Sequence, residues 1–222
     1  MKGEGRIAKD LATLRGLGKR ERREFVWDYY KIPILALASI LALAALSLAA
    51  TIGRGSTVLY AVLVNADDTG NSAVFSELLA QSGIDMDGKQ VDVSAGYTLR
   101  YDGMGASDGE TVQVLAALFG IGDLDLFAAD QPVFDSYASQ GAFVDLGLFI
   151  GKEELARQEL YLYEDSNGHQ AVAGIWLREG SPLHRAGYFA EDVVIGVAAQ
   201  AQNLDPAVAL LGQLAAVYSP KG

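Results

Sequence analysis

Four polar residues stand where two expected strands end, and their side chains could bind a polar ligand. They are Asn65 and Asp67, after the apolar segment 57–65, and Asp130 and Gln131, after the segment 123–129. In an open α/β sheet, ligands bind beyond the carboxyl ends of the strands. An Asn amide can donate and accept hydrogen bonds, and an Asp carboxylate can accept them. The alternative is that these residues only form turns and helix caps, which Asn and Asp favour in any protein.

The carboxylate spacings do not point to a metal centre. Asp85 and Asp87 begin like a calcium loop, but Lys89 stands where the next alternate ligand would be. Asp123 and Asp125 share one face of an expected strand, and a metal pair there would need further ligands beside them. We expect one of these two to start the strand and the other to be capped or paired.

The remaining chemistry-bearing residues also lack a catalytic spacing. The two histidines, His169 and His184, are isolated from each other and from any metal-ligand motif. The chain has neither a nucleophile elbow nor a phosphate-loop lysine motif, and it has no cysteine. We therefore predict no enzymatic activity, no metal and no cofactor.

Three aromatic residues could form a ligand platform of the kind that sugar-binding proteins use. Tyr161, Tyr163 and Trp176 fall on two expected antiparallel strands. The same residues suit one face of a hairpin that packs against the rest of the domain, and we favour this packing interpretation. Trp176 is the fifth candidate ligand-binding residue.

Local patterns along residues 54–222 predict alternating strands and helices. Continuous runs of Val and Leu are typical of strands that are buried on both faces of a parallel sheet. The expected strands are 57–65, 90–99, 123–129, 160–163, 171–177 and 193–201, and the expected helices are 73–82, 110–119, 131–139, 152–158 and 206–218. This order predicts an α/β domain with one mostly parallel sheet and a small antiparallel β insert.

An uncharged apolar run near the N-terminus predicts one membrane span. The 22 residues from Ile32 to Gly53 contain no ionisable side chain. As a helix they would extend about 33 Å, enough to cross a hydrocarbon core of about 30 Å. We therefore expect the chain to bind the lipid bilayer through Ile32–Gly53. A signal peptide cleaved near 47–49 is the alternative, although the run and the segment before it are long for one.

The charges on either side of this run predict its orientation. Residues 1–31 carry nine Lys or Arg and five acidic residues, whereas residues 54–222 carry eight and 23. The positive-inside rule then predicts a cytoplasmic tail at 1–31, a transmembrane helix at 32–53 and an extracytoplasmic domain at 54–222. The acidic balance of the outer domain argues against a nucleic-acid partner.

Two segments of the outer domain resemble bacterial extracellular solute-binding proteins. They are DLDLFAADQPVFDSYASQGAFVDL at 123–146 and DVVIGVAAQAQNLDPAVALLGQLAAVY at 192–218. In that family a strand ending in Asp precedes a helix, and a later strand returns before an Ala- and Leu-rich helix. The family usually closes two lobes over a ligand, but only about 45 residues separate the two segments here. The resemblance therefore implies about one lobe of that fold, with a membrane span in place of the usual lipidated Cys.

These observations lead to one functional expectation and one alternative. We expect a single-pass bacterial membrane protein whose outer domain binds without catalysis, either to a partner protein of an envelope complex or to a small solute. The alternative is an accessory component of a membrane importer, which binds a solute and passes it to a permease.

Overall fold

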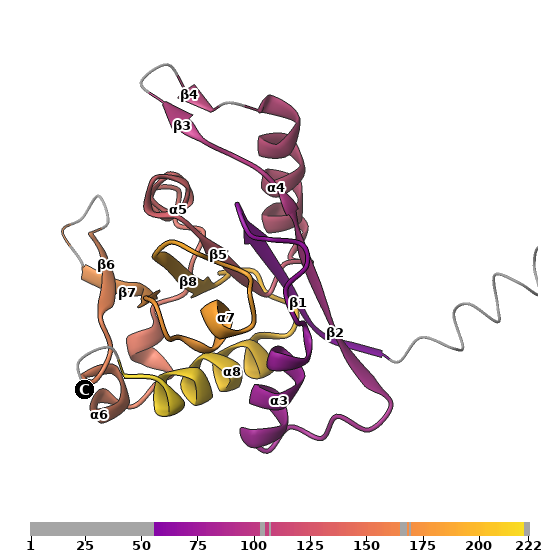
Figure 1. The fold of residues 1–222 in the computed structure, drawn as a ribbon. Coiled ribbons are helices and arrows are strands. Elements are labelled where there is room, and N and C mark those ends of the chain that lie inside the picture. The colour runs from indigo at the N-terminus through magenta and orange to yellow at the C-terminus, as the bar shows by residue number, and fades with distance from the viewer. Residues whose placement is uncertain (1–55, 103–104, 107, 165–167, 169, 220–222) are drawn as a thin grey trace, which may run out of the picture. The chain divides into compact units, whose positions relative to one another are not determined.

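The computed structural model describes residues 56–219 apart from 103–104, 107, 165–167 and 169 (Figure 1). The expected cytoplasmic tail and transmembrane helix lie outside these residues. Among the residues that are described, no helix is both long and apolar enough to cross a membrane. The strands are β1 (Ser56–Val64), β2 (Lys89–Tyr97), β3 (Tyr101–Asp102), β4 (Gly105–Ala106), β5 (Leu126–Ala129), β6 (Leu160–Glu164), β7 (Gln170–Leu177) and β8 (Val193–Val197). The helices are α3 (Ala73–Gln81), α4 (Gly109–Ile121), α5 (Gln131–Ala138), α6 (Lys152–Leu155), α7 (Pro182–Arg185) and α8 (Leu204–Val217), with a 3₁₀ turn η1 at Leu146–Leu148.

Six of the strands form one mixed sheet in the order β2-β1-β5-β8-β7-β6. Strand β1 is parallel to both β2 and β5. Strands β5 and β8, β8 and β7, and β7 and β6 are antiparallel. The predicted α/β class is therefore confirmed, and parallel pairing is confined to the β2-β1-β5 half of the sheet.

This arrangement corrects two details of the sequence prediction. The pair β6–β7 is not a separate insert, because it extends the main sheet at one edge. Strand β8 runs opposite to β5, although its residues are all buried, as they would be in a parallel strand. Helices cover both faces of β8, and an apolar pattern reports this burial without reporting the direction of the strand.

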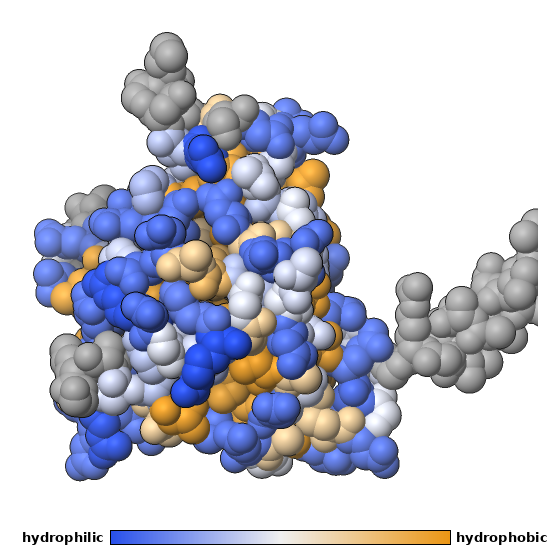
Figure 2. Space-filling model, viewed as in Figure 1, coloured by the Kyte–Doolittle hydropathy of each residue, from blue (hydrophilic) through white to orange (hydrophobic). Residues whose placement is uncertain are grey.

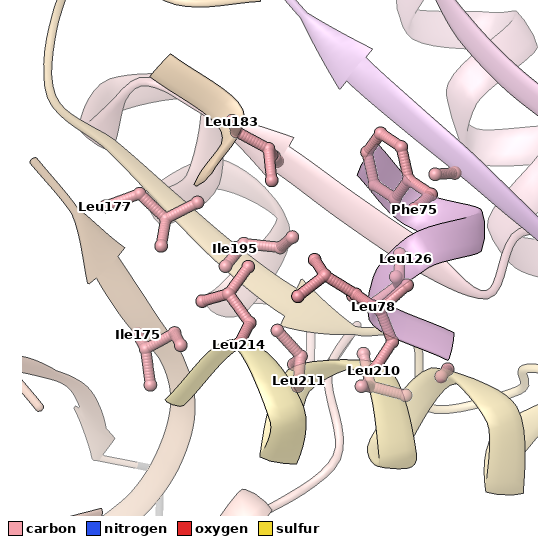
Figure 3. Close-up of a cluster of buried hydrophobic side chains, with 14 of the residues drawn as sticks. Phe75, Leu78, Leu126, Ile175, Leu177, Leu183, Ile195, Leu210, Leu211 and Leu214 are labelled. Atoms are coloured by element: carbon pink, nitrogen blue, oxygen red, sulfur yellow. The ribbon is translucent and has the colours of Figure 1, made fainter. Parts of the chain in front are cut away.

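Helices pack on both faces of the sheet (Figure 1), and the side chains between helices and sheet form two apolar cores. Helices α3, α7 and α8 cover one face, where Phe75, Leu78, Leu210 and Leu214 meet strand residues such as Ile195 (Figure 3). Helices α4 and α5 cover the other face, where aromatic rings gather. This second core is built around Leu115, Phe127, Val133, Phe134 and Tyr137.

Short polar residues fix where the helices on the second face begin. The Asp108 side chain accepts a hydrogen bond from the Glu110 amide and caps α4, and Asp130 caps α5 in the same way through Val133. Gly122 ends α4 in the left-handed conformation, with φ of 76°. These are the usual start and stop signals of a helix, and they explain why the predicted helix bounds hold within a few residues.

Candidate functional site

Asn65 lies at the carboxyl end of β1 and connects three segments of the domain. It adopts the left-handed conformation, with φ of 58°, which Asn tolerates better than most residues. Its side-chain amide donates to the Leu99 carbonyl oxygen at 2.6 Å and to Asp130 Oδ2 at 2.8 Å. Its Oδ1 accepts from the Leu99 amide at 2.9 Å. The structure thus brings Asn65 and Asp130 together, as the rule for parallel strands predicts.

Asp130 is occupied on both carboxyl oxygens. Its Oδ2 accepts from Asn65, and its Oδ1 accepts from the Val133 amide at 3.1 Å as the cap of α5. We name Asn65, Leu99 and Asp130 the strand-end latch. Its polar side-chain atoms already bond to the chain itself, so a solute at this place would have to displace internal hydrogen bonds.

Replacing Asn65 should weaken the fold. We expect Asn65→Ala to lower the free energy of unfolding by about 2 kcal/mol, since it removes three hydrogen bonds and leaves an alanine in a left-handed conformation. Urea unfolding followed by near-ultraviolet circular dichroism measures this change. Asn65→Gly removes the same bonds without the backbone strain, so a larger loss for Gly than for Ala would contradict this explanation.

Two other predicted residues lie near the latch but take no part in it. Asp67 is exposed in the turn after β1, and its Oδ1 accepts hydrogen bonds from the Thr69 amide at 2.9 Å and the Thr69 hydroxyl at 2.7 Å. These bonds lower the pKa of Asp67. Gln131 is exposed on the first turn of α5. Both positions fit the turn-and-cap alternative, and a ligand-binding role for them stays a prediction.

Trp176 packs within the β6–β7 part of the sheet. In the cross-strand row it is separated from Ala129 of β5 by Val194 of β8, which places it about two strand spacings, roughly 10 Å, from the end of β5. The guanidinium of Arg178 lies 4.6 Å from the centroid of its ring. The rings of Tyr161 and Phe134 meet edge to face, with their centroids 4.9 Å apart. Tyr161, Tyr163 and Trp176 are all partly buried against the second core, which agrees with the packing interpretation, and a ligand-binding role for Trp176 stays a prediction.

Arg178 is held in place over this ring by two carboxylates. It forms ion pairs with Glu159 and Asp192, and its Nε donates to Glu159 Oε2 at 3.0 Å. The hydrogen bonds that Arg178 donates to Glu159 raise the pKa of Arg178 above its ordinary value. One face of Trp176 is thus covered by a fixed side chain of the same domain.

The acidic and histidine residues that could suggest metal binding are used locally or lie apart. Among the described residues, no three His, Asp or Glu side chains converge on a metal position. Asp85 Oδ1 accepts from the Asp87 amide in a tight turn at 3.0 Å. His184 Nδ1 lies 2.7 Å from the Ser181 hydroxyl at the start of α7. His169 lies outside the described residues.

A polar hollow of about 620 Å³ lies on the face of the sheet that α4 only partly covers. Asp92 in this hollow already accepts hydrogen bonds from Thr57 Oγ1 at 2.6 Å and Gln90 Nε2 at 3.1 Å. Asp123 accepts from Gln202 Nε2 at 3.0 Å. Burial of the ring, with Tyr97 beside it, raises the pKa of Tyr60, so its hydroxyl stays protonated at neutral pH. The hollow is lined mostly by polar groups that bond to one another.

A different surface feature escaped the sequence analysis, and it is the better candidate for binding. A groove of about 430 Å³ opens between α3, α7 and the end of α8. Five apolar residues line it, and we name them the apolar groove: Val74, Leu78, Pro182, Ala186 and Val217. Figure 2 shows hydrophobic surface gathered over α3 and α8 on this face. Val217 is 47% exposed although it is apolar.

The apolar groove has a charged rim. Glu77 of α3 and Arg185 of α7, both exposed, line the same groove. One sequence signal points to part of it: Val74, Glu77, Leu78 and Gln81 recur at the spacing of one helix face. The contribution of α7 and α8 has no counterpart in local sequence, because it arises only when these helices pack beside α3.

Comparison of the chain with known protein families, curated proteins and solved structures gives no match. The candidate sites therefore rest on the chain's own sequence and geometry.

Proposed function

We propose that residues 54–222 form a non-enzymatic binding domain that recognises a partner protein at the outer surface of a bacterial membrane, with Ile32–Gly53 as its anchor. The apolar groove is the observation that carries this proposal. Open grooves that combine an apolar lining with polar or charged edges are typical of protein-interaction surfaces. The uncharged run at 32–53 and its basic flank support the anchor.

The groove also indicates what kind of partner segment would fit. Its apolar lining suits a row of apolar side chains, such as one face of an amphipathic helix. A basic residue of the partner would complement Glu77, and an acidic residue would complement Arg185. Because residues 54–222 carry 23 acidic and eight basic residues, a partner with net positive charge would be attracted over a longer range.

A partner protein is favoured over a small solute by the condition of the strand-end latch. Solute sites enclose most of their ligand and present free polar groups to it. Here Asn65 and Asp130 direct their polar atoms at each other and at Leu99 and Val133. Solute binding, alone or as an accessory of an importer, remains the alternative, and Asn65 and Asp130 are the residues that it would use.

Photocrosslinking in membranes of the source cell tests the partner and its site together. A photoreactive residue in place of Gln81, at the edge of the apolar groove, should form an adduct with one partner. The same residue in place of Gln113, which is exposed on α4, should not. Extraction with alkaline carbonate tests the anchor separately, because a chain anchored by Ile32–Gly53 remains in the membrane fraction.

A matched pair of valine variants decides whether the groove itself binds. Val217→Asp places a charge in the apolar groove. We expect it to lower the adduct yield from position 81 about tenfold or more, which corresponds to a loss of at least about 1.4 kcal/mol of binding free energy. Val114→Asp places the same charge on α4, where Val114 is 38% exposed, and should leave the yield unchanged. Equal yields from the two variants would sink the proposal that this groove is the binding surface.

A further inference from the structure

Strand β2 lies at one edge of the six-stranded sheet. It is nine residues long, and among the described strands it pairs only with β1. An edge strand leaves a row of backbone N–H and C=O groups on its outer side, which can pair with another strand. The outer side of β2 is therefore able to form backbone hydrogen bonds with a further strand.

The hydrogen bonds to β1 show which residues of β2 face outward. The Gly88 carbonyl oxygen accepts from the Ser56 amide of β1 at 3.1 Å, so Gly88 faces inward. The N–H and C=O of one strand residue point to the same side, and the side alternates along the strand. The residues that direct both groups away from β1 are therefore Lys89, Val91 and Val93. Beyond Ser94 the register is irregular, and the Tyr97 carbonyl oxygen faces inward and accepts from the Asn65 amide at 2.9 Å.

The side chains of β2 are symmetric about Val93. Val91, Val93 and Ala95 lie on one face and pack against the core beneath α3, whereas Gln90, Asp92 and Ser94 lie on the other. A second copy of β2 laid antiparallel, with Val93 opposite Val93, would place Val91 opposite Ala95 and Asp92 opposite Ser94. Apolar then meets apolar, and no like charges oppose each other.

The outward-facing backbone groups are compatible with this register. Paired residues of an antiparallel ladder exchange both hydrogen bonds only where both point toward the partner, as Val93 does. A ladder centred on Asp92 would satisfy the outward-facing backbone groups as well, because Val91 would then pair with Val93, but it would place Asp92 directly opposite Asp92, and like charges in that position are destabilising. The backbone allows both registers, and the charges favour pairing about Val93.

The segment also lacks the features that usually prevent edge pairing. Between Val91 and Ala95 there is no proline and no charge on the apolar face. The irregular register on the β2 side begins only after Ser94. The opposite edge, β6, is five residues long and is interrupted between Tyr161 and Leu162. Of the two edges, β2 is the one suited to pairing.

We propose that β2 pairs antiparallel with β2 of a second copy of this chain, about a two-fold axis at Val93, so that the two six-stranded sheets join. One strand pair buries less area than the roughly 1,200–2,000 Å² typical of stable soluble complexes. Anchoring in a membrane raises the effective concentration of two copies and compensates for the small interface. This inference rests on the anchor of the proposed function, but not on the apolar groove.

Cysteine crosslinking in the full chain tests the register, because the natural chain contains no cysteine. Oxidation of membranes carrying Val93→Cys should give a disulfide-linked dimer, since a hydrogen-bonded cross-strand pair has Cα atoms about 5.5 Å apart. Val91→Cys alone should not, because the two copies of residue 91 would lie about 13 Å apart along the ladder. We expect a dimer yield at least about tenfold higher at 93 than at 91.

Two further combinations complete the test. Chains with Val91→Cys and Ala95→Cys, expressed together, should crosslink to each other, and Asp92→Cys with Ser94→Cys should do so without a change in the core. Leu162→Cys, 52% exposed on the other edge, should stay monomeric. Equal yields at 93, 91 and 162, or no dimer from any β2 combination, would overturn the inference. Loss of the protein on carbonate extraction with the 93-specific crosslink retained would overturn the anchor alone.

Discussion

Asp125→Ala should lower the free energy of unfolding by about 3–5 kcal/mol, the largest single-residue effect that we expect in this domain. Asp125 is fully buried. Its Oδ2 accepts from the Tyr60 amide at 2.8 Å and from Asn203 Nδ2 at 3.0 Å, and its Oδ1 accepts from the Asn203 amide at 2.8 Å. Alanine would leave all three part-buried donors without their acceptor, and each unsatisfied buried group costs about 1–3 kcal/mol.

The position of Asp125 explains why the loss should spread through the fold. The residue lies just before β5, and its side chain connects β1 to the start of α8. Its backbone adds two bonds: its amide donates to the Tyr60 carbonyl at 3.0 Å, and its carbonyl accepts from the Ala198 amide at 2.9 Å. One residue therefore holds β1, β5 and the end of β8 in register.

Urea unfolding of the full chain in detergent micelles measures the effect. A Trp27→Phe background leaves Trp176 as the only tryptophan, so its fluorescence reports on the domain. Asp123→Ala is the matched control: Asp123 is exposed and accepts one hydrogen bond, so we expect a change within about 0.5 kcal/mol. The loss in free energy of unfolding for Asp125→Asn should lie between those of the two alanine variants. Similar losses for both alanine variants would show that the buried network is not the cause.

The sequence predicts the elements of this fold better than it predicts how they assemble. The helix at 73–82 and the strand at 57–65 follow from local periodicity, and both are observed within a residue of those bounds. The expected strand 123–129 is shorter in the structure, where regular pairing with β1 and β8 begins at Leu126 and the side chain of Asp125 bonds to Asn203, which is distant in sequence. Strand direction in the β8 half depends on the path through α6, the β6–β7 hairpin and α7, which no local pattern records.

The candidate site shows the same division. Parallel strands end at one edge of a sheet, so the proximity of Asn65 and Asp130 is predictable from strand order alone. That their polar atoms are all hydrogen-bonded within the chain is not predictable, because it requires the backbone of Leu99 to lie beside Asn65. The apolar groove was missed because Val74 and Val217 come from opposite ends of the domain and meet only after α3 and α8 pack on the sheet.

The tight packing beneath α5 gives the second large effect: Gly196→Ala should lower the free energy of unfolding by about 2–3 kcal/mol. Gly196 is in β8, and a Cβ added there would lie 2.5 Å from the Ala173 carbonyl oxygen and 2.9 Å from Phe134 Cζ. The carbonyl belongs to a neighbouring strand and cannot rotate away. The Phe134 ring is stacked on Phe143 with centroids 4.1 Å apart, so it cannot move without disturbing a second ring.

A second glycine substitution separates this steric effect from the general effect of replacing glycine. Gly212 lies inside α8, and a Cβ added there would meet no atom within 4 Å. Gly212→Ala should therefore raise the free energy of unfolding by about 0.5–1 kcal/mol, the ordinary gain for alanine in a helix. The same urea titration measures both variants, and their shifts must have opposite signs. If Gly196→Ala instead raised the free energy of unfolding, β7 and β8 would have to separate easily. The packing of Phe134 against the sheet would then not be what holds α5 in place.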